Sequence, residues 1–326
     1  MVQGWRVLDA TSFEGVVSAR PGSLTLTPWG ESSPAHVLPA ADIAMLLIGV
    51  KTSVTAAALH RMTSHDIVLL ASDWRGVPIA GLYPWSDHGR VAARHIAQAS
   101  LSQPRKKNAW MQLIRAKISG QAATLRAVDH RGADRLSELA KKVRSGDPDN
   151  LEGLAARIYW SRLLRDPDSK FRRDPESTDP FNWKLNYGYA VMRGYGIRAV
   201  LAAGLSPPLG LFHRGRGNFF NLVDDIIEPF RPAIDDVVRR LESAGPLDEA
   251  EAKRALVAAA SQVFRSDGKR IPALLTDLSQ QLGRYVEGEV ERLVVPSWNG
   301  VCSPTVELGD DPFSELADEV ILDPPW

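Results

Sequence analysis

The segment Tyr83-Pro84-Trp85-Ser86-Asp87 separates two kinds of sequence pattern. Before it, short apolar runs alternate with turn residues, a pattern typical of β-strands. After it, a proline and an aspartate that can cap a helix precede long segments whose apolar residues recur every 3.6 positions, which predicts helices. We therefore expect an α+β protein in three parts: a β-rich domain over residues 1–84, an almost all-α domain over 85–298 and an acidic tail over 299–326.

The β-rich part contains a hairpin signal. Apolar runs around Val17 and Leu24 flank Arg20-Pro21-Gly22, which favours a tight turn. Further strands are expected over residues 35–38, 45–50, 67–70 and 77–82, and a helix over 52–59. In the second part, helices are expected over residues 92–100, 109–126, 135–144, 151–164, 185–203, 218–228, 233–243, 249–264 and 271–293.

Composition narrows the class of protein. The chain has 326 residues, of which 44% are hydrophobic, enough for a buried core. A single cysteine, Cys302, excludes an intrachain disulfide and a cysteine-based zinc cluster, and it fits a reducing cytosol. No stretch reaches the roughly 20 apolar residues of a membrane span, so we expect a cytoplasmic protein.

The charges balance overall but not locally. Lys plus Arg and Asp plus Glu both number 39, so the net charge gives no sign of a polyanionic partner. Basic residues nevertheless gather between Arg90 and Arg144 and again from Lys170 onward, and such runs are often only solvated helix faces. The basic residues that could contact a polyanion such as DNA are Lys106, Lys107, Arg172, Arg173, Arg214 and Arg216.

Glu152 is the first candidate for chemistry. The pattern predicts a helix with Asp149 as its N-cap and Glu152 three residues later. At this spacing the Glu152 carboxylate could have a purely structural role, accepting hydrogen bonds from the free backbone N–H groups of the first turn. Ala155, Ala156 and Tyr159 share its helix face, however. A carboxylate on a packed face needs a partner, and a metal ion is one such partner.

His213 is the second candidate. It ends an apolar run and precedes Arg214-Gly215-Arg216-Gly217. The glycines allow close backbone approach, and the forked arginine donors match phosphate oxygens. A lone histidine before a surface turn is also common in protein cores, so this window alone leaves its role open.

The helix expected after this loop carries acidic residues. Asp225 and Glu228 are three residues apart, and Asp224 and Glu228 are four apart, so spacing does not choose between the two aspartates. Ordinary surface acids remain an alternative. Together with His213, these side chains suit Mg²⁺ or Mn²⁺, ions that polarise phosphoryl oxygens. No G-x-x-x-x-G-K-[ST] loop or G-x-G-x-x-G motif is present, which excludes those two nucleotide sites.

The segments Glu152–Tyr159 and His213–Pro232 resemble the signatures of the CRISPR-associated spacer-acquisition integrases, the Cas-one family, in a form closest to type II systems. The joint offsets of Asp225 and Glu228 after His213 are the specific part of this resemblance. It extends from Trp5 to about Trp298.

The resemblance implies a β domain that mediates homodimerisation and a helical domain that binds Mg²⁺ or Mn²⁺. It implies that Glu152, His213 and Glu228 are catalytic metal ligands, with Asp225 as a less certain fourth. The family joins the 3′-hydroxyl ends of a short DNA duplex, the prespacer, to the leader-repeat boundary of a CRISPR array by transesterification. Two dimers flank a dimer of a small partner, Cas-two, in a heterohexamer, and in type II systems the effector nuclease and an accessory protein also take part.

Two other functions are compatible with the sequence. The chain could be a non-catalytic DNA-binding scaffold that works through its basic face, with salt-dependent binding and no product. It could also be a generic structure-selective metallonuclease that cleaves branched DNA without the small partner.

Overall fold

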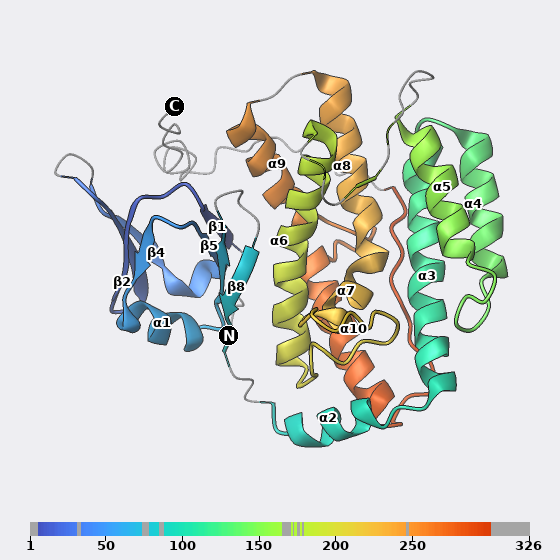
Figure 1. The fold of residues 1–326 in the computed structure, drawn as a ribbon, viewed down its shortest axis with the longest axis horizontal. Coiled ribbons are helices and arrows are strands. Elements are labelled where there is room, and N and C mark those ends of the chain that lie inside the picture. The colour runs from blue at the N-terminus through green and yellow to red at the C-terminus, as the bar shows by residue number, and fades with distance from the viewer. Residues whose placement is uncertain are drawn as a thin grey trace. The chain divides into compact units, whose positions relative to one another are not determined.

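The computed structural model describes residues 6–30, 34–73, 78–84, 88–164, 171, 173–174, 177, 179–245 and 248–300 (Figure 1). The chain divides into two compact units, with the boundary between Trp85 and Ser86. All named strands lie in the first unit, and all named helices after α1 lie in the second. The predicted α+β class is therefore confirmed. Residues 301–326, most of the predicted acidic tail, lie outside the described residues.

The first unit contains two four-stranded sheets, ordered β1-β5-β7-β8 and β4-β3-β2-β6. The strands are β1 (Arg6–Ala10), β2 (Gly15–Arg20), β3 (Ser23–Pro28), β4 (His36–Pro39), β5 (Ile43–Ile48), β6 (Thr52–Val54), β7 (Val68–Ser72) and β8 (Pro78–Leu82). A short 3-10 helix, η1 (Ala40–Asp42), and one α-helix, α1 (Ala56–Thr63), connect them. Every residue of β5 is buried, and this strand lies between β1 and β7 in its sheet. Side chains from both sheets, such as Val17 and Leu46, form one hydrophobic core.

The predicted hairpin is confirmed, because β2 and β3 pair antiparallel with Arg20 opposite Ser23. Pro21 and Gly22 form the turn, and the φ of Gly22 is 75°, a conformation that glycine adopts without a steric cost.

Two assignments in this unit were wrong. Residues 52–54, predicted to begin a helix, form β6, which pairs parallel with β2. The helix begins at Ala56, since the Thr55 side chain accepts a hydrogen bond from the backbone N–H of Ala58. Strand β1 was missed, because four of its five residues are only half-buried and no clear alternation marks it.

The second unit is helical, and every helix predicted there is present. The elements are α2 (Val91–Ala99), α3 (Gln103–Arg126), α4 (His130–Lys142), α5 (Leu151–Leu163), α6 (Pro180–Ala202), α7 (Asn221–Ile227), the 3-10 helix η2 (Glu228–Phe230), α8 (Arg231–Ala244), α9 (Glu249–Ala260) and α10 (Ile271–Val286). Helix α10 ends earlier than predicted, just before Gly288, whose φ is 83°. Trp298 is 1% exposed and packs against Phe264, with the ring centroids 5.4 Å apart. Among the described helices, none has the length and apolar character needed to cross a membrane.

Two prolines divide the segment that carries the acidic residues. Pro229 lies in the first turn of η2 and Pro232 in the first turn of α8. Backbone N–H groups in a first turn have no acceptor within the helix, so proline, which lacks this group, is tolerated there. Helix α7 therefore ends at Ile227, and Glu228 lies at the junction with its side chain buried.

A buried carboxylate joins three helices of this unit. Asp235 of α8 is 1% exposed and accepts hydrogen bonds from the hydroxyls of Tyr159 on α5, at 3.0 Å, and Tyr189 on α6. Burial raises the pKa of Asp235 to about 7, although both tyrosine hydroxyls favour the carboxylate.

This pKa predicts a pH-dependent stability. Because the folded pKa lies above the unfolded value of about 4, Asp235 contributes stability that is complete below that value and is lost as the pH rises through about 7. The loss approaches about 1.4 kcal/mol per pH unit. Asp235→Asn should remove this contribution, so urea unfolding followed by circular dichroism should show a flatter pH dependence between about pH 4 and 7. An unchanged slope in the variant would contradict the prediction.

Candidate active site

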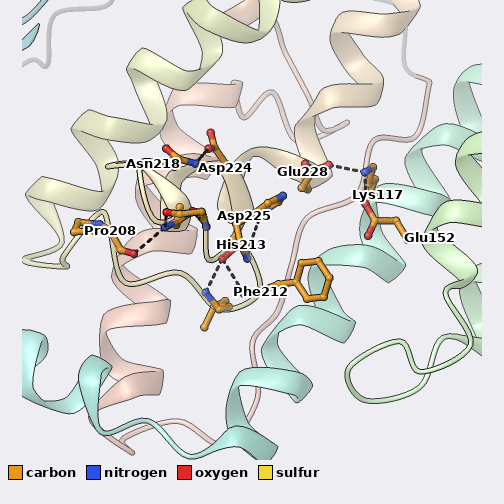
Figure 2. Close-up of polar contacts among 12 residues, drawn as sticks. Lys117, Glu152, Pro208, Phe212, His213, Asn218, Asp224, Asp225 and Glu228 are labelled. Carbon is orange, nitrogen blue, oxygen red and sulfur yellow. Dashed lines mark hydrogen bonds and ion pairs between the residues drawn. The ribbon is translucent and has the colours of Figure 1, made fainter. Parts of the chain in front are cut away.

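Lys117 joins the two glutamates that the sequence singled out. Its Nζ lies 2.6 Å from Oε1 of Glu152 and 2.7 Å from Oε2 of Glu228 (Figure 2). The three side chains come from α3, α5 and η2 and are 13%, 24% and 5% exposed, respectively. Two carboxylates from separate elements therefore surround one cationic group.

The electrostatics keep Lys117 and Glu228 charged. Burial alone would lower the pKa of Lys117, but the charges of Glu228 and Glu152 outweigh it and the pKa is raised. Burial would likewise raise the pKa of Glu228, but Arg231 and Lys117 outweigh it and the pKa is lowered. The Nε of Arg231 lies 3.3 Å from Oε1 of Glu228. Each buried charge thus has an opposite charge beside it.

The helix that carries Glu152 is not capped as predicted. Asn150, not Asp149, is the N-cap of α5, so the capping assignment of Asp149 was wrong. Oδ2 of Asp147 accepts a hydrogen bond from the backbone N–H of Glu152 at 2.9 Å. Neighbouring side chains therefore serve the helix N-terminus, and the Glu152 carboxylate is directed to Lys117.

His213 is held by the buried carboxylate of Asp225. Its Nδ1 lies 2.7 Å from Oδ1 of Asp225, which is 0% exposed (Figure 2). The same carboxylate accepts hydrogen bonds from the backbone N–H groups of Leu211, Phe212 and His213, at 2.6, 3.1 and 3.1 Å. The hydrogen bond to Asp225 raises the pKa of His213, although burial opposes it. Nδ1 is thereby engaged, which leaves Nε2 as the ring atom able to bind another group.

The structure distinguishes the two adjacent aspartates. Asp224 accepts two hydrogen bonds from Arg193, at 2.7 and 2.8 Å, and one from Asn218 at 2.7 Å. Asp224 therefore ties the loop before α7 to α6, whereas Asp225 fixes the position of His213.

A divalent cation needs several oxygen or nitrogen ligands close together. Among the residues that the structure describes, no three His, Cys, Asp or Glu side chains are close enough together to hold a metal ion. Glu152 and Glu228 nevertheless already surround a cation, and their oxygens are the hard ligands that Mg²⁺ and Mn²⁺ prefer. The residues fit such an ion if the Lys117 ammonium withdraws. The predicted site of Glu152, His213, Glu228 and Asp225 stays a prediction.

The candidate DNA contacts differ in their surroundings. Arg214 and Arg216 are exposed on the loop after His213, and Lys107 is exposed on α3 beside half-buried Lys106. Arg173 is directed inward, because its guanidinium donates to side-chain oxygens on α6, those of Asn182 at 2.9 Å and Asn186 at 2.6 Å. Arg172 lies outside the described residues.

Lys117 is the member of this cluster to which the sequence reasoning gave no role in the site. It lies on α3 between Ala116 and Ile118, which are both buried. A lysine within such an apolar stretch needs a buried carboxylate as a partner, and this requirement could have identified it.

The fold and these side chains define a two-unit α+β protein whose helical unit holds a lysine between two glutamates and a histidine fixed by a buried aspartate. The chain belongs to the Cas1 family, since the family model described as CRISPR associated protein Cas1 matches residues 11–260. The resemblance seen in the sequence is confirmed.

Individual relatives agree with this assignment. The chain is 37% identical over 238 residues to the CRISPR-associated endonuclease Cas1 of Neisseria meningitidis serogroup C, covering 72% of this chain and 75% of the relative. It is similar to a chain of a Cas6-RT-Cas1–Cas2 complex, with a TM-score of 0.73 and 19% identity, over 93% of this chain and 37% of that one. It is also similar to a casposase bound to integration product, with a TM-score of 0.68 and 18% identity, over 97% and 99% of the two chains. At these identities the two structures show a shared fold.

Lys117→Met tests the charge compensation. Without metal, the variant should lose about 3 kcal/mol of unfolding free energy, because buried Glu228 and half-buried Glu152 lose their shared cation. Mn²⁺ should raise its melting temperature more than that of the wild type and should bind it more tightly, as measured by electron paramagnetic resonance of free Mn²⁺. Lys117→Arg is the control that keeps the charge. Weaker Mn²⁺ binding by the methionine variant would contradict the argument.

Asp225→Asn tests the positioning of His213. An amide places an NH₂ group or a weaker acceptor against the N–H groups of the loop, which should cost about 2 kcal/mol of unfolding free energy. The proton resonance of Nδ1 of His213 should shift or disappear. Asp224→Asn is the matched control, and its cost should be smaller because Arg193 is 34% exposed. Equal costs, with an unchanged His213 resonance, would show that Asp225 does not hold the ring.

Proposed function

We propose that the chain is a metal-dependent DNA endonuclease and integrase of CRISPR adaptation. Membership of the Cas1 family, whose relative in Neisseria meningitidis is named an endonuclease, supports the class of reaction. The observation that carries the proposal is the pair of carboxylates, Glu152 and Glu228, already arranged around a cation. A nuclease that polarises a phosphoryl oxygen requires such a donor set.

The proposed reaction joins the 3′-hydroxyl end of a prespacer to the CRISPR array. The 3′-oxygen forms a bond to an array phosphorus, the bond from that phosphorus to the array 3′-oxygen breaks, and one hydroxyl proton is released while the departing oxygen gains one. Glu152, Glu228 and Nε2 of His213 would hold Mg²⁺ or Mn²⁺, which supplies Lewis-acid polarisation of the phosphate. Asp225 would orient the His213 ring and would not itself bind the ion, because loop N–H groups and Nδ1 of His213 already contact its oxygens.

The DNA and protein partners follow from the same proposal. Arg214 and Arg216 are exposed beside His213, where guanidinium groups would bind the phosphates that flank the reacting bond. Lys106 and Lys107 of α3 would extend this contact along the duplex. We further propose a homodimer formed through the β-rich unit and assembly with the small partner Cas2, since a chain of the same fold belongs to a Cas1–Cas2 complex.

One observation favours a second candidate function, a non-catalytic DNA-binding scaffold. The Lys117 ammonium stands between the two glutamates, and such a bridge would suit a protein that never binds metal. A scaffold would bind the same DNA through its exposed arginines without forming a product.

His213→Ala tests the proposed function. With Mn²⁺, Cas2, a fluorescent duplex and a plasmid that carries the array, the variant should join DNA at least about 100-fold more slowly, since even an outer partner of a metal ligand contributes about 10–100-fold. Its DNA affinity should change little. His130→Ala, an exposed histidine at the start of α4, is the matched control.

The outcomes separate the candidates. Equal joining by the wild type and His213→Ala would show that the site is assigned to the wrong residues. Salt-dependent binding by both, with no joined product at any Mn²⁺ or Mg²⁺ concentration, would establish the scaffold instead.

A further inference from the structure

An aromatic pair lies directly beside the candidate active site. The rings of Phe212 and Trp110 are stacked, with centroids 4.3 Å apart and planes 3° from parallel. Trp110, on α3, is 1% exposed, whereas Phe212, on the loop before α7, is 50% exposed. Both rings contact the ring of His213 edge-on, at centroid distances of 5.8 and 5.9 Å. Trp110 therefore covers one face of Phe212, and the rest of that ring reaches solvent.

The loop holds this exposed ring in place. The backbone N–H of Phe212 donates to Asp225 at 3.1 Å, and its neighbours Leu211 and His213 donate to the same carboxylate (Figure 2). A large apolar ring that is half exposed gains little from core packing, yet here it is fixed by a buried acid and a buried indole. Such a fixed, half-covered ring is suited to binding a planar group from outside.

A cavity of about 280 Å³ opens at the aromatic pair. Lys107, Gly146, Gln103 and Arg214 line it together with Phe212 and Trp110. Lys107 and Arg214 are exposed cations, and Arg214 donates to Oε1 of Gln103 at 3.2 Å. The cavity therefore combines an aromatic face with two positive charges.

We propose that Phe212 is a stacking platform for an unpaired base at a DNA end, which it holds beside His213. This inference rests on the proposed function for its substrate class. Inside a duplex both faces of a base are covered by neighbouring base pairs, so only an unpaired or terminal base can stack on the ring. Lys107 and Arg214 bind the phosphates next to that base. Since the 3′-hydroxyl is the proposed nucleophile, stacking positions the end that reacts.

The test measures stacking directly, in the full-length chain without metal. A duplex with a short 3′ overhang carries the fluorescent base 2-aminopurine at its terminal position, and EDTA prevents any reaction. Wild type should quench the fluorophore, and Phe212→Leu should abolish quenching and weaken overhang binding about tenfold, the scale of one base stacked on one aromatic ring. Phe212→Trp should retain both. Binding of a covalently closed circular duplex, which has no end, should be unchanged by Phe212→Leu.

Phe219→Leu is the matched control. Phe219 lies on the same loop and is 60% exposed, but it meets Phe220 edge-on and does not line the cavity. This variant should quench like the wild type, and all variants should melt within a few degrees of it. The proposal is overturned if Phe212→Leu still quenches, if Phe219→Leu loses quenching equally, or if free dAMP competes at the concentration of the oligonucleotide, which would indicate a nucleotide site.

The design separates this proposal from the function that it rests on. If quenching depends on Phe212 while neither wild type nor any variant joins DNA with Mn²⁺, the stacking platform stands and the integrase function fails. If joining occurs but Phe212→Leu quenches normally, the integrase stands and the platform is wrong.

Discussion

The Lys117 ammonium between Glu152 and Glu228 is the contact on which the helical unit depends. Helices α3 and α5 and the short helix η2 meet there, and each contributes one charged side chain that is mostly withdrawn from water. An unpaired buried charge costs several kcal/mol, so the opposite charges stabilise the approach of these three elements. Arg231 adds a second cation at 3.3 Å from Glu228, which brings the centre to neutrality.

The fold was predictable where local signals determine it. The named helices of the second unit were all located, because the 3.6-residue apolar period that predicts a helix lies within the sequence of that helix. Strands β1 and β6 were not located. Strand β1 shows no clear alternation, and β6 owes its conformation to pairing with β2, more than thirty residues earlier in the chain. The helix starting at Leu151 was located but its cap was misassigned, because Asp147, Asp149 and Asn150 are all good capping residues and only the path of the chain chooses among them.

The residue types of the candidate site were predictable from the sequence, but which residue contacts which partner was not. Spacing could not separate Asp224 from Asp225, because both lie on one short helix and their partners, Arg193 and His213, come from different segments. The pairing of Lys117 with Glu152 and Glu228 was missed for the same reason, since the two carboxylates lie far along the chain from it. An ion pair between distant segments leaves no periodic mark in the sequence. Its only local trace is a charged residue on an apolar helix face.

Charge balance governs what can be added to this centre. Lys117 and Arg231 already neutralise Glu152 and Glu228, so a divalent cation would leave two positive charges uncompensated if both side chains stayed in place. Either the ammonium withdraws or phosphate anions arrive to balance the excess. The two changes reinforce each other, because an approaching phosphate attracts the Lys117 ammonium toward its own oxygens and away from the carboxylates. Under the proposed function, metal and DNA would therefore bind cooperatively here, each more tightly in the presence of the other.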